Sequence, residues 1–250
     1  MDKNYWDTFS TTYNAEIFDV LKNDKNGIIK SCINQQASPK KVVGDIGCAI
    51  GKWLPLLSSK FKQVYAIDFS TAFLDYSKKK YRQLKNIVYQ DADMSMHFEP
   101  ENKFDTILCV NAVITDNYSR RNSFFKNLFA SLTHNGSLIL VVPSLESALY
   151  SEFVFDEYQR KMGLPDRNSN SLYQKSKSGN IKKGIIDIDN IPTKHYLKEE
   201  LVFTLAKNGF TTERIDKVEY SWNTEMADSP KWLRSPYPWD WLALAHKKAS

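Results

Sequence analysis

Between residues 41 and 143 the sequence alternates short apolar runs with stretches of helical periodicity. The predicted strands are 42–46, 63–68, 86–90, 104–110 and 136–142. The predicted helices between them are 51–60, 71–81 and 120–132. Strands that are apolar throughout and joined by helices are typical of a parallel sheet covered on both faces. Ligands bind such sheets at the carboxyl ends of the strands, so a functional site is expected there.

The flanking segments predict a lid, an insertion and a final pair of strands, all within a single α/β domain over residues 1–250. The outer elements are predicted as helices at 27–36, 147–162 and 196–208 and as strands at 184–189, 211–222 and 239–246. The parts of the domain are a helical lid (1–40), a core (41–143), an insertion lying over the sheet (144–192) and a C-terminal helix with an antiparallel strand pair (193–250).

Composition narrows the class of protein. No apolar run approaches the roughly 18–20 residues that span a bilayer, so no membrane association is expected. The net charge of +5 comes from basic residues interspersed with acidic ones, which makes a nucleic-acid partner unlikely. Cys32, Cys48 and Cys109 lie far apart, and this argues against a zinc site or a disulfide framework. We therefore expect a cytoplasmic protein without a bound metal.

A glycine-rich junction follows the first predicted strand. Gly44, Gly47 and Gly51 fall within eight residues, and glycine lets a backbone turn approach a ligand closely. The spacing does not match the G-x-G-x-x-G run that binds a pyrophosphate. The acidic side chain of Asp45 would repel a phosphate but can hold an ammonium group. The junction therefore favours a cationic, amino-acid-like ligand over a nicotinamide dinucleotide.

Acidic residues also end the second and third predicted strands. Asp68 would lie beside the glycine turn, where a carboxylate can accept hydrogen bonds from two ribose hydroxyls. The run Asp91-Ala92-Asp93 could accept a hydrogen bond from the exocyclic amine of an adenine. An ammonium group, a ribose and an adenine together describe S-adenosylmethionine.

The sequence of these segments resembles that of the class I S-adenosylmethionine-dependent methyltransferases. The matching segments, in the family's order, are 42–51, 66–70, 90–93, 103–112, 135–140 and 196–210. The resemblance implies a three-layer Rossmann-like fold whose seven-stranded sheet has an antiparallel last strand. It also implies that S-adenosylmethionine is the cofactor and S-adenosylhomocysteine the product. The cofactor-binding residues that it implies are Tyr13, Asp45, Gly47, Cys48, Ala49, Gly51, Trp53, Asp68, Phe69, Ser70, Asp91, Ala92, Asp93, Val110, Asn111 and Ala112.

One residue of the glycine junction departs from the family pattern. Ala49 stands where the family usually has glycine. An alanine fits this position if its φ is negative, although its methyl group would then approach the cofactor.

A general base is harder to identify from the sequence. His195 and Tyr196 begin a predicted helix on the family's substrate side, and they are the candidate catalytic residues. A strong base is not required, because in-line positioning of an activated donor can supply roughly 7–11 kcal/mol of the barrier.

The acceptor is predicted to be a small molecule methylated on O, N or S. The loop from Asn111 to Ile114 lacks the N/D-P-P-Y/F run associated with methylation of nucleobase amines. The insertion and the aromatic segment from Trp222 to Trp241 are expected to shape the acceptor pocket. A protein or peptide acceptor, or a non-catalytic module that only binds the cofactor, are the alternatives. Both a monomer and a homodimer fit the sequence.

Overall fold

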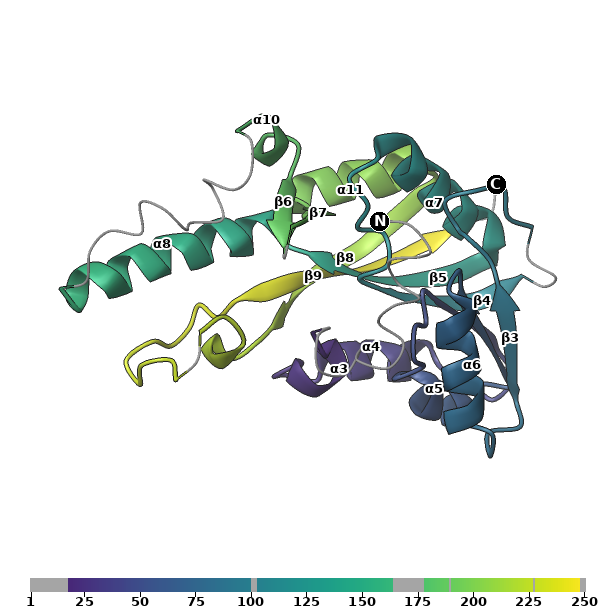
Figure 1. The fold of residues 1–250 in the computed structure, drawn as a ribbon. Coiled ribbons are helices and arrows are strands. Elements are labelled where there is room, and N and C mark those ends of the chain that lie inside the picture. The colour runs from purple at the N-terminus through teal and green to yellow at the C-terminus, as the bar shows by residue number, and fades with distance from the viewer. Residues whose placement is uncertain (1–17, 100–102, 164–177, 189, 227, 248–250) are drawn as a thin grey trace.

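Seven strands form one mixed sheet in the order β3-β2-β1-β4-β5-β9-β8 (Figure 1). The computed structural model describes residues 18–99, 103–163, 178–188, 190–226 and 228–247. The strands are β1 (Val42–Ile46), β2 (Gln63–Asp68), β3 (Ile87–Asp91), β4 (Phe104–Val110), β5 (Leu132–Pro143), β8 (Phe210–Glu219) and β9 (Trp239–Lys247). Their order confirms the predicted parallel core and the antiparallel final pair.

The direction of each strand follows from its connection. Strands β1 to β5 are parallel to one another, because a helix or a long loop returns the chain each time. Strand β9 runs antiparallel to both β5 and β8. The central strands β1, β2 and β4 are buried on both faces, which explains their nearly continuous apolar sequences. The carboxyl ends of β1, β2 and β4 consequently meet at one edge.

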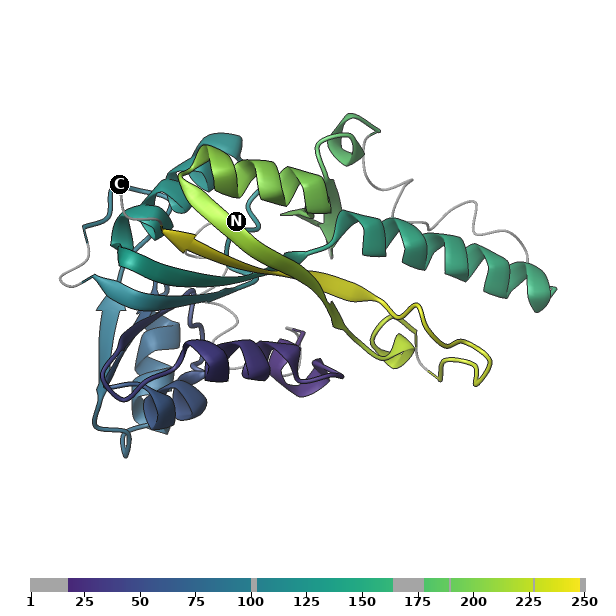
Figure 2. The same ribbon diagram turned by 180° about the vertical axis from the view of Figure 1, so that it is seen from behind.

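Helices cover both faces of the sheet, as predicted. Helices α4 (Ile28–Gln36), α5 (Leu54–Lys60) and α6 (Thr71–Lys80) lie on one face (Figures 1 and 2). Helices α7 (Tyr118–Ser131) and α11 (Lys198–Lys207) lie on the other face. Two separate apolar cores result, one under each layer of helices. This three-layer arrangement leaves the strand ends open to a ligand.

The first helical layer is preceded by a short helix and a polar contact to the core. Helix α3 (Val20–Asn23) begins after Asp19, whose side chain accepts a hydrogen bond from the backbone of Lys22. The same side chain also forms an ion pair with Lys52 in the loop before α5, at 2.8 Å. The described end of the N-terminal segment is therefore attached beside the carboxyl end of β1.

The insertion after β5 contains a long helix and a small hairpin. Helix α8 (Leu145–Lys161) extends away from the sheet, and it is followed by α10 (Ser178–Ile181) (Figure 1). Strands β6 (Ile185–Ile188) and β7 (Ile191–Lys194) then pair with each other. The strand predicted over 184–189 is therefore present, but it belongs to this hairpin and not to the main sheet.

The β6–β7 hairpin is attached to the loop that follows β4. Thr193 forms a β-bridge with Thr115, and the backbone N–H of Lys194 donates to the carbonyl of Ile114 at 2.8 Å. This attachment places the paired strands of the hairpin near the carboxyl ends of the parallel strands. Among the described residues, no helix is both long and apolar enough to cross a membrane.

Candidate functional site

A cavity of about 760 Å³ opens at the carboxyl ends of the parallel strands. Its floor is formed by the loops after β1, β2, β3 and β4, and its walls by the N-terminal segment and the β6–β7 hairpin. Most of the residues predicted to bind a cofactor line it. They are Asp45, Gly47, Cys48, Ala49, Trp53, Asp68, Phe69, Ala92, Asp93, Val110, Asn111 and Ala112.

The turn after β1 is held against the end of β2. The backbone N–H groups of Gly47 and Cys48 both donate to the carbonyl oxygen of Ile67, at 2.8 and 3.1 Å. Gly47 has a φ of 73°, and a Cβ there would overlap the Cβ of Ala112. Only glycine satisfies both the left-handed backbone and the close approach of the β4 loop. These contacts thus hold the turn in a fixed position in the ligand-free protein.

Ala49 adopts a positive φ of 45°, so the negative φ under which an alanine fits this position is not met. Its backbone N–H donates to Oδ2 of Asp68 at 2.9 Å, and this bond fixes the peptide in a glycine-like conformation. A residue with a Cβ is strained there, by roughly 1–2 kcal/mol in the left-handed region. The alanine therefore keeps the turn geometry of a glycine at a cost in stability.

Replacing Ala49 by glycine should raise the free energy of unfolding by about 1 kcal/mol, because the left-handed strain disappears while the unfolded chain gains some entropy. Chemical denaturation measures the change. Ala37, which has an ordinary φ of −72° at the end of α4, provides the matched control. Ala37→Gly should give no gain, and a gain of equal size there would contradict the strain argument.

Two acidic side chains at the ends of β1 and β2 are buried beside this turn. Asp45 is 2% exposed, and its Oδ2 atom has no hydrogen-bond partner among the described residues. Burial, together with the nearby charge of Asp68, raises the pKa of Asp45 to about 8. Asp45 is therefore a carboxyl group without a counterion at the wall of the cavity.

Asp68 has a different environment. Its Oδ2 accepts the N–H of Ala49 and its Oδ1 accepts the N–H of Ser70, both at 2.9 Å. Burial raises the pKa of Asp68 to about 6, while these backbone donors act in the opposite direction. Each carboxylate oxygen can accept further hydrogen bonds, so Asp68 can still bind a hydroxyl group.

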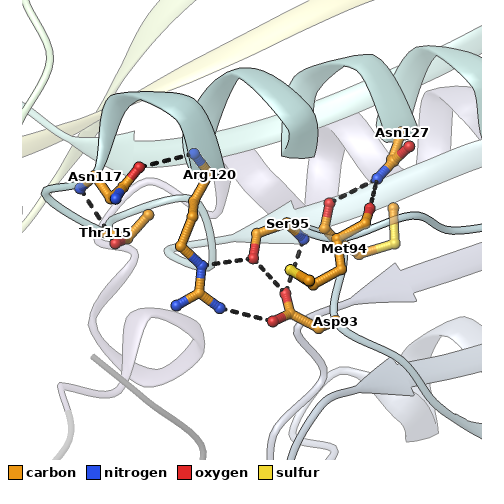
Figure 3. Close-up of polar contacts among 8 residues, drawn as sticks. Asp93, Met94, Ser95, Thr115, Asn117, Arg120 and Asn127 are labelled. Atoms are coloured by element: carbon orange, nitrogen blue, oxygen red, sulfur yellow. Dashed lines mark hydrogen bonds and ion pairs between the residues drawn. The ribbon is translucent and has the colours of Figure 1, made fainter.

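The other charged groups in the lining are paired. Asp93 forms an ion pair with Arg120 at 2.7 Å, and its Oδ1 accepts from both the N–H and the hydroxyl of Ser95 (Figure 3). The Nε of Arg120 donates to the hydroxyl of Ser95 at 2.8 Å. Lys52 is paired with Asp19. Asp45 and Asp68 are therefore the carboxylates of the described lining that lack a cationic partner in it, and they favour a cationic ligand.

Some predicted cofactor residues do not line the cavity. A Cβ at Gly51 would overlap Ser77 on α6, so this glycine serves helix packing. Ser70 is fully buried, and its hydroxyl caps the start of α6. Asp91 is exposed at the end of β3. Tyr13 lies outside the described residues, as does the part of the predicted lid before residue 18.

The two candidate catalytic residues also lie outside the cavity lining. The hydroxyl of Tyr196 is buried and donates to the carbonyl of Val113 at 2.6 Å. Nδ1 of His195 lies 3.1 Å from the carbonyl of Thr193, and burial lowers the pKa of His195 to about 4. The hydroxyl of Tyr196 holds its segment against the β4 loop, and the His195 ring contacts a carbonyl of its own segment, so the geometry does not support the predicted catalytic role.

Replacing Tyr196 by phenylalanine should therefore affect stability more than function. Loss of the bond to Val113 leaves a buried carbonyl unpaired, which lowers the free energy of unfolding by about 1–3 kcal/mol. Binding of S-adenosylhomocysteine, measured by calorimetry on the folded variant, should stay within about twofold of the wild type. A stable Tyr196→Phe protein that has lost methyl transfer would restore the catalytic interpretation.

The structure adds lining residues that the sequence did not single out. Phe18 and Val20 come from the N-terminal segment, and Ile188 and Ile191 come from the β6–β7 hairpin. Arg120 enters from the first turn of α7. Apolar residues in such segments carry no motif, because their role depends on which loop they are folded against. The one sequence feature that could have pointed to Arg120 as a lining residue is its position in the first turn of a helix, three residues after the N-cap Asn117.

Comparisons with known proteins agree with this geometry. Residues 43–136 match a family model described as a methyltransferase domain. An S-adenosylmethionine-dependent methyltransferase of Methanosarcina mazei has a similar structure, with a TM-score of 0.65 and 17% identity over 88% of this chain and 98% of the other. The N-methyltransferase NodS of Bradyrhizobium japonicum, solved with S-adenosylhomocysteine, gives 0.63 and 11% over 99% and 98%.

A third similar structure is an S-adenosylmethionine-dependent methyltransferase of Clostridium acetobutylicum. It has a TM-score of 0.60 and 16% identity over 98% of this chain and all of the other. No curated protein matches the sequence significantly. At these identities the structural likeness concerns the fold, and the family match concerns the residues that build the cavity floor. Residues 43–136 thus match a methyltransferase domain, and the chain as a whole shares the Rossmann-like fold of solved S-adenosylmethionine-dependent methyltransferases.

Proposed function

We propose that the cavity binds S-adenosylmethionine and that the protein transfers its methyl group to O, N or S of a small molecule. The observation that carries this proposal is the pair Asp45 and Asp68. Asp45 has an unpartnered carboxylate oxygen and lies beside a pinned glycine turn. Buried charges are normally paired, so a cation bound beside this oxygen would stabilise the ionised form of Asp45. The ammonium group of the cofactor is such a cation, and its ribose hydroxyls suit Asp68.

The remaining lining residues divide between the two ends of the cofactor. Phe69 and Ala92 provide an apolar surface for the adenine, since both line the cavity after β2 and β3. The acidic oxygens of Asp93 are engaged by Ser95 and Arg120, so its contribution to the adenine would compete with these bonds. Val110, Asn111 and Ala112 would lie beside the sulfonium at the carboxyl end of β4. These assignments extend the resemblance to this chain residue by residue.

The chemistry asks little of the protein beyond positioning. The bound cofactor supplies an activated methyl group on a sulfonium. All four histidines lie in the described residues, and none of them lines the cavity. The side chains of this protein therefore bind, orient and exclude water, and an acceptor that needs no strong base fits the site best.

A small-molecule acceptor is supported by the form of the cavity. Its volume of about 760 Å³ falls within the range of ligand pockets, and the β6–β7 hairpin covers it with Ile188 and Ile191. A protein or peptide acceptor would require an open groove on this side. A module that binds the cofactor without catalysis would leave every acceptor unmethylated. We further infer a reducing, cytoplasmic location, which the three free and buried cysteines support.

Titration calorimetry tests the cofactor first. S-adenosylmethionine and S-adenosylhomocysteine should bind with micromolar affinity, and NAD should not bind, because its pyrophosphate would face Asp45 and Asp68. Tight NAD binding, or no binding of the first two ligands to the folded protein, would contradict the proposal. Mass spectrometry with a trideuteromethyl cofactor then shows whether an acceptor is labelled.

A further inference from the structure

One part of the cavity lining has no role in the proposed binding of the cofactor. It comes from the loop after β4, the start of α7 and the β6–β7 hairpin, which are joined to one another. Thr115 of the loop forms a β-bridge with Thr193 of the hairpin, and the guanidinium of Arg121 on α7 donates to the carbonyl of Thr115 at 2.7 Å. We call this part the α7–hairpin wall, and its residues are Ile114, Arg120, Phe124, Ile188 and Ile191.

The cation of this wall, Arg120, is held by the loop after β3. Its Nη2 forms the ion pair with Oδ2 of Asp93 at 2.7 Å, and its Nε donates to the hydroxyl of Ser95 at 2.8 Å (Figure 3). The same hydroxyl donates to Oδ1 of Asp93 at 2.6 Å, so Ser95 connects the two charged groups. These bonds occupy the Nε–Nη2 edge of the planar guanidinium. The orientation of the Arg120 side chain is therefore fixed in the ligand-free protein.

The other edge of the guanidinium is open to a ligand. A guanidinium has five N–H donors, and the bonds to Asp93 and Ser95 use only the Nε donor and one donor of Nη2. The donors of Nη1 and the second donor of Nη2 have no partner among the described residues, and Nη1 points away from Asp93 (Figure 3). The Arg120 side chain is 36% exposed and lines the cavity. Two such donors side by side match the two oxygens of a carboxylate or phosphate group.

The other residues of the α7–hairpin wall are apolar. Phe124 lies one turn after Arg120 on the same face of α7, and the three isoleucines come from the β4 loop and the hairpin. A cationic fork beside apolar side chains suits an organic anion, because the fork binds its charge and the wall covers its hydrocarbon part. We propose that Arg120 binds a carboxylate or phosphate group of the methyl acceptor, which is therefore a small organic anion with an apolar part. This proposal rests on the proposed function.

The cofactor also carries a carboxylate, but at its other end. That carboxylate is attached to the same carbon as the ammonium group, which the proposed function places at Asp45. Arg120 is bonded to Asp93, which directly follows Ala92 at the proposed adenine end. The amino-acid part and the adenine are opposite ends of the cofactor, so its carboxylate does not reach Arg120. The acceptor is then the molecule that supplies the anion, and it does so without displacing Asp93.

The identity of the acceptor gives the first test. The protein is incubated with trideuteromethyl S-adenosylmethionine and a bacterial metabolite extract, and mass spectrometry identifies the labelled products against a blank without protein. An acceptor with a carboxylate or phosphate group supports the proposal. Label confined to acceptors without an anionic group overturns this proposal alone. The absence of any labelled product counts against methyl transfer itself, and this proposal fails with it.

A second test changes the anion and Arg120 together. The labelled acceptor and its neutral amide or ester are compared as substrates of the wild type and of Arg120→Gln. On the wild type, the neutral compound should have a KM at least tenfold above that of the anion. In Arg120→Gln the KM for the anion should rise at least tenfold and the preference for the anion should vanish, while kcat and the Kd for S-adenosylhomocysteine change less than threefold. A preference for the anion that survives in Arg120→Gln would overturn the proposal.

Two further variants complete the design. Arg160 is exposed on α8, forms an ion pair with Glu157 and does not line the cavity, so Arg160→Gln is the matched control with an unchanged KM. Arg120→Lys keeps the charge but loses the fork, and it also decides the matter if Arg120→Gln fails to fold. Its KM for the anion should rise about threefold to tenfold with the preference for the anion retained, and a wild-type KM would overturn the proposal.

Binding of S-adenosylhomocysteine separates this proposal from the two other roles that Arg120 could have. A Kd that rises tenfold in both Arg120 variants with the KM for the acceptor unchanged would assign Arg120 to the cofactor or to the β3 loop, and would overturn the proposal. Failure of the wild type to bind S-adenosylhomocysteine would instead count against the proposed function itself.

Discussion

Replacing Asp45 by asparagine is expected to stabilise the ligand-free protein and to weaken ligand binding. The Asp45 carboxyl has a pKa of about 8 in the folded protein against 3.8 as its ordinary value. Between these values the folded state binds more protons than the unfolded state, so the wild type loses stability as the pH rises from about 4 to 8. Each pH unit with a difference of one proton is worth about 1.4 kcal/mol. Asparagine does not titrate and escapes this loss.

Denaturation curves at several pH values measure this effect. The free energy of unfolding of Asp45→Asn should exceed that of the wild type by little near pH 4. This difference should grow by several kcal/mol up to about pH 8 and should then level off. Calorimetry should show weaker binding of S-adenosylhomocysteine, by about 2 kcal/mol or roughly 30-fold in Kd, since a charged hydrogen bond is lost. Asp75, exposed on α6, provides the control: Asp75→Asn removes the same formal charge and should leave both quantities near the wild type. A difference between Asp45→Asn and the wild type that does not vary with pH would contradict the burial of an unpaired carboxyl group.

Replacing Gly47 by alanine should destabilise the protein by about 3 kcal/mol or more, because the change combines left-handed strain with overlap in a packed turn. The added Cβ would meet the Cβ of Ala112, so the β1 turn and the β4 loop cannot both keep their positions. Thermal or chemical denaturation measures the loss. Calorimetry on the remaining folded protein should show no binding of S-adenosylhomocysteine at concentrations that saturate the wild type.

Two further variants separate the cost of a left-handed backbone from the cost of the overlap between a Cβ at residue 47 and Ala112. Gly27 has a φ of 63° and no heavy atom within 4 Å of the Cβ position, so Gly27→Ala should cost only about 1 kcal/mol. The double variant Gly47→Ala with Ala112→Gly removes the overlapping methyl group and should recover part of the stability. If the double variant is no more stable than Gly47→Ala alone, contact with Ala112 is not the cause.

The sequence predicted the cavity floor well because that part of the fold is built from short-range patterns. Apolar runs of five to seven residues defined β1, β2 and β4, and the carboxyl ends of parallel strands meet at one edge. Asp45, Asp68 and Gly47 could therefore be placed together from their positions along the chain. The left-handed backbone of Ala49 could not be predicted, because it depends on the long-range bond from its N–H to Asp68.

The walls of the cavity were harder to predict from the sequence, because they too depend on long-range contacts. His195 and Tyr196 precede a helix, which suggested a role in the site, but both side chains are buried, and the hydroxyl of Tyr196 donates to the β4 loop. The strand over 184–189 alternates like a sheet edge, yet its partner is a neighbouring segment of the insertion. Which surface an insertion packs against is decided by tertiary contacts, and these leave no periodic signal.

The attachment of the β6–β7 hairpin has an evolutionary consequence. The hairpin touches the β4 loop through backbone hydrogen bonds of Thr193 and Lys194, which do not depend on the side chains of its turn. Ile188 and Ile191 at that turn can change while the register, the glycine junction and both buried aspartates stay as they are. Under the proposed function, acceptor preference could thus change by single substitutions in a segment separate from the one proposed to hold the methyl donor, and a laboratory selection for new acceptors would begin with these two isoleucines.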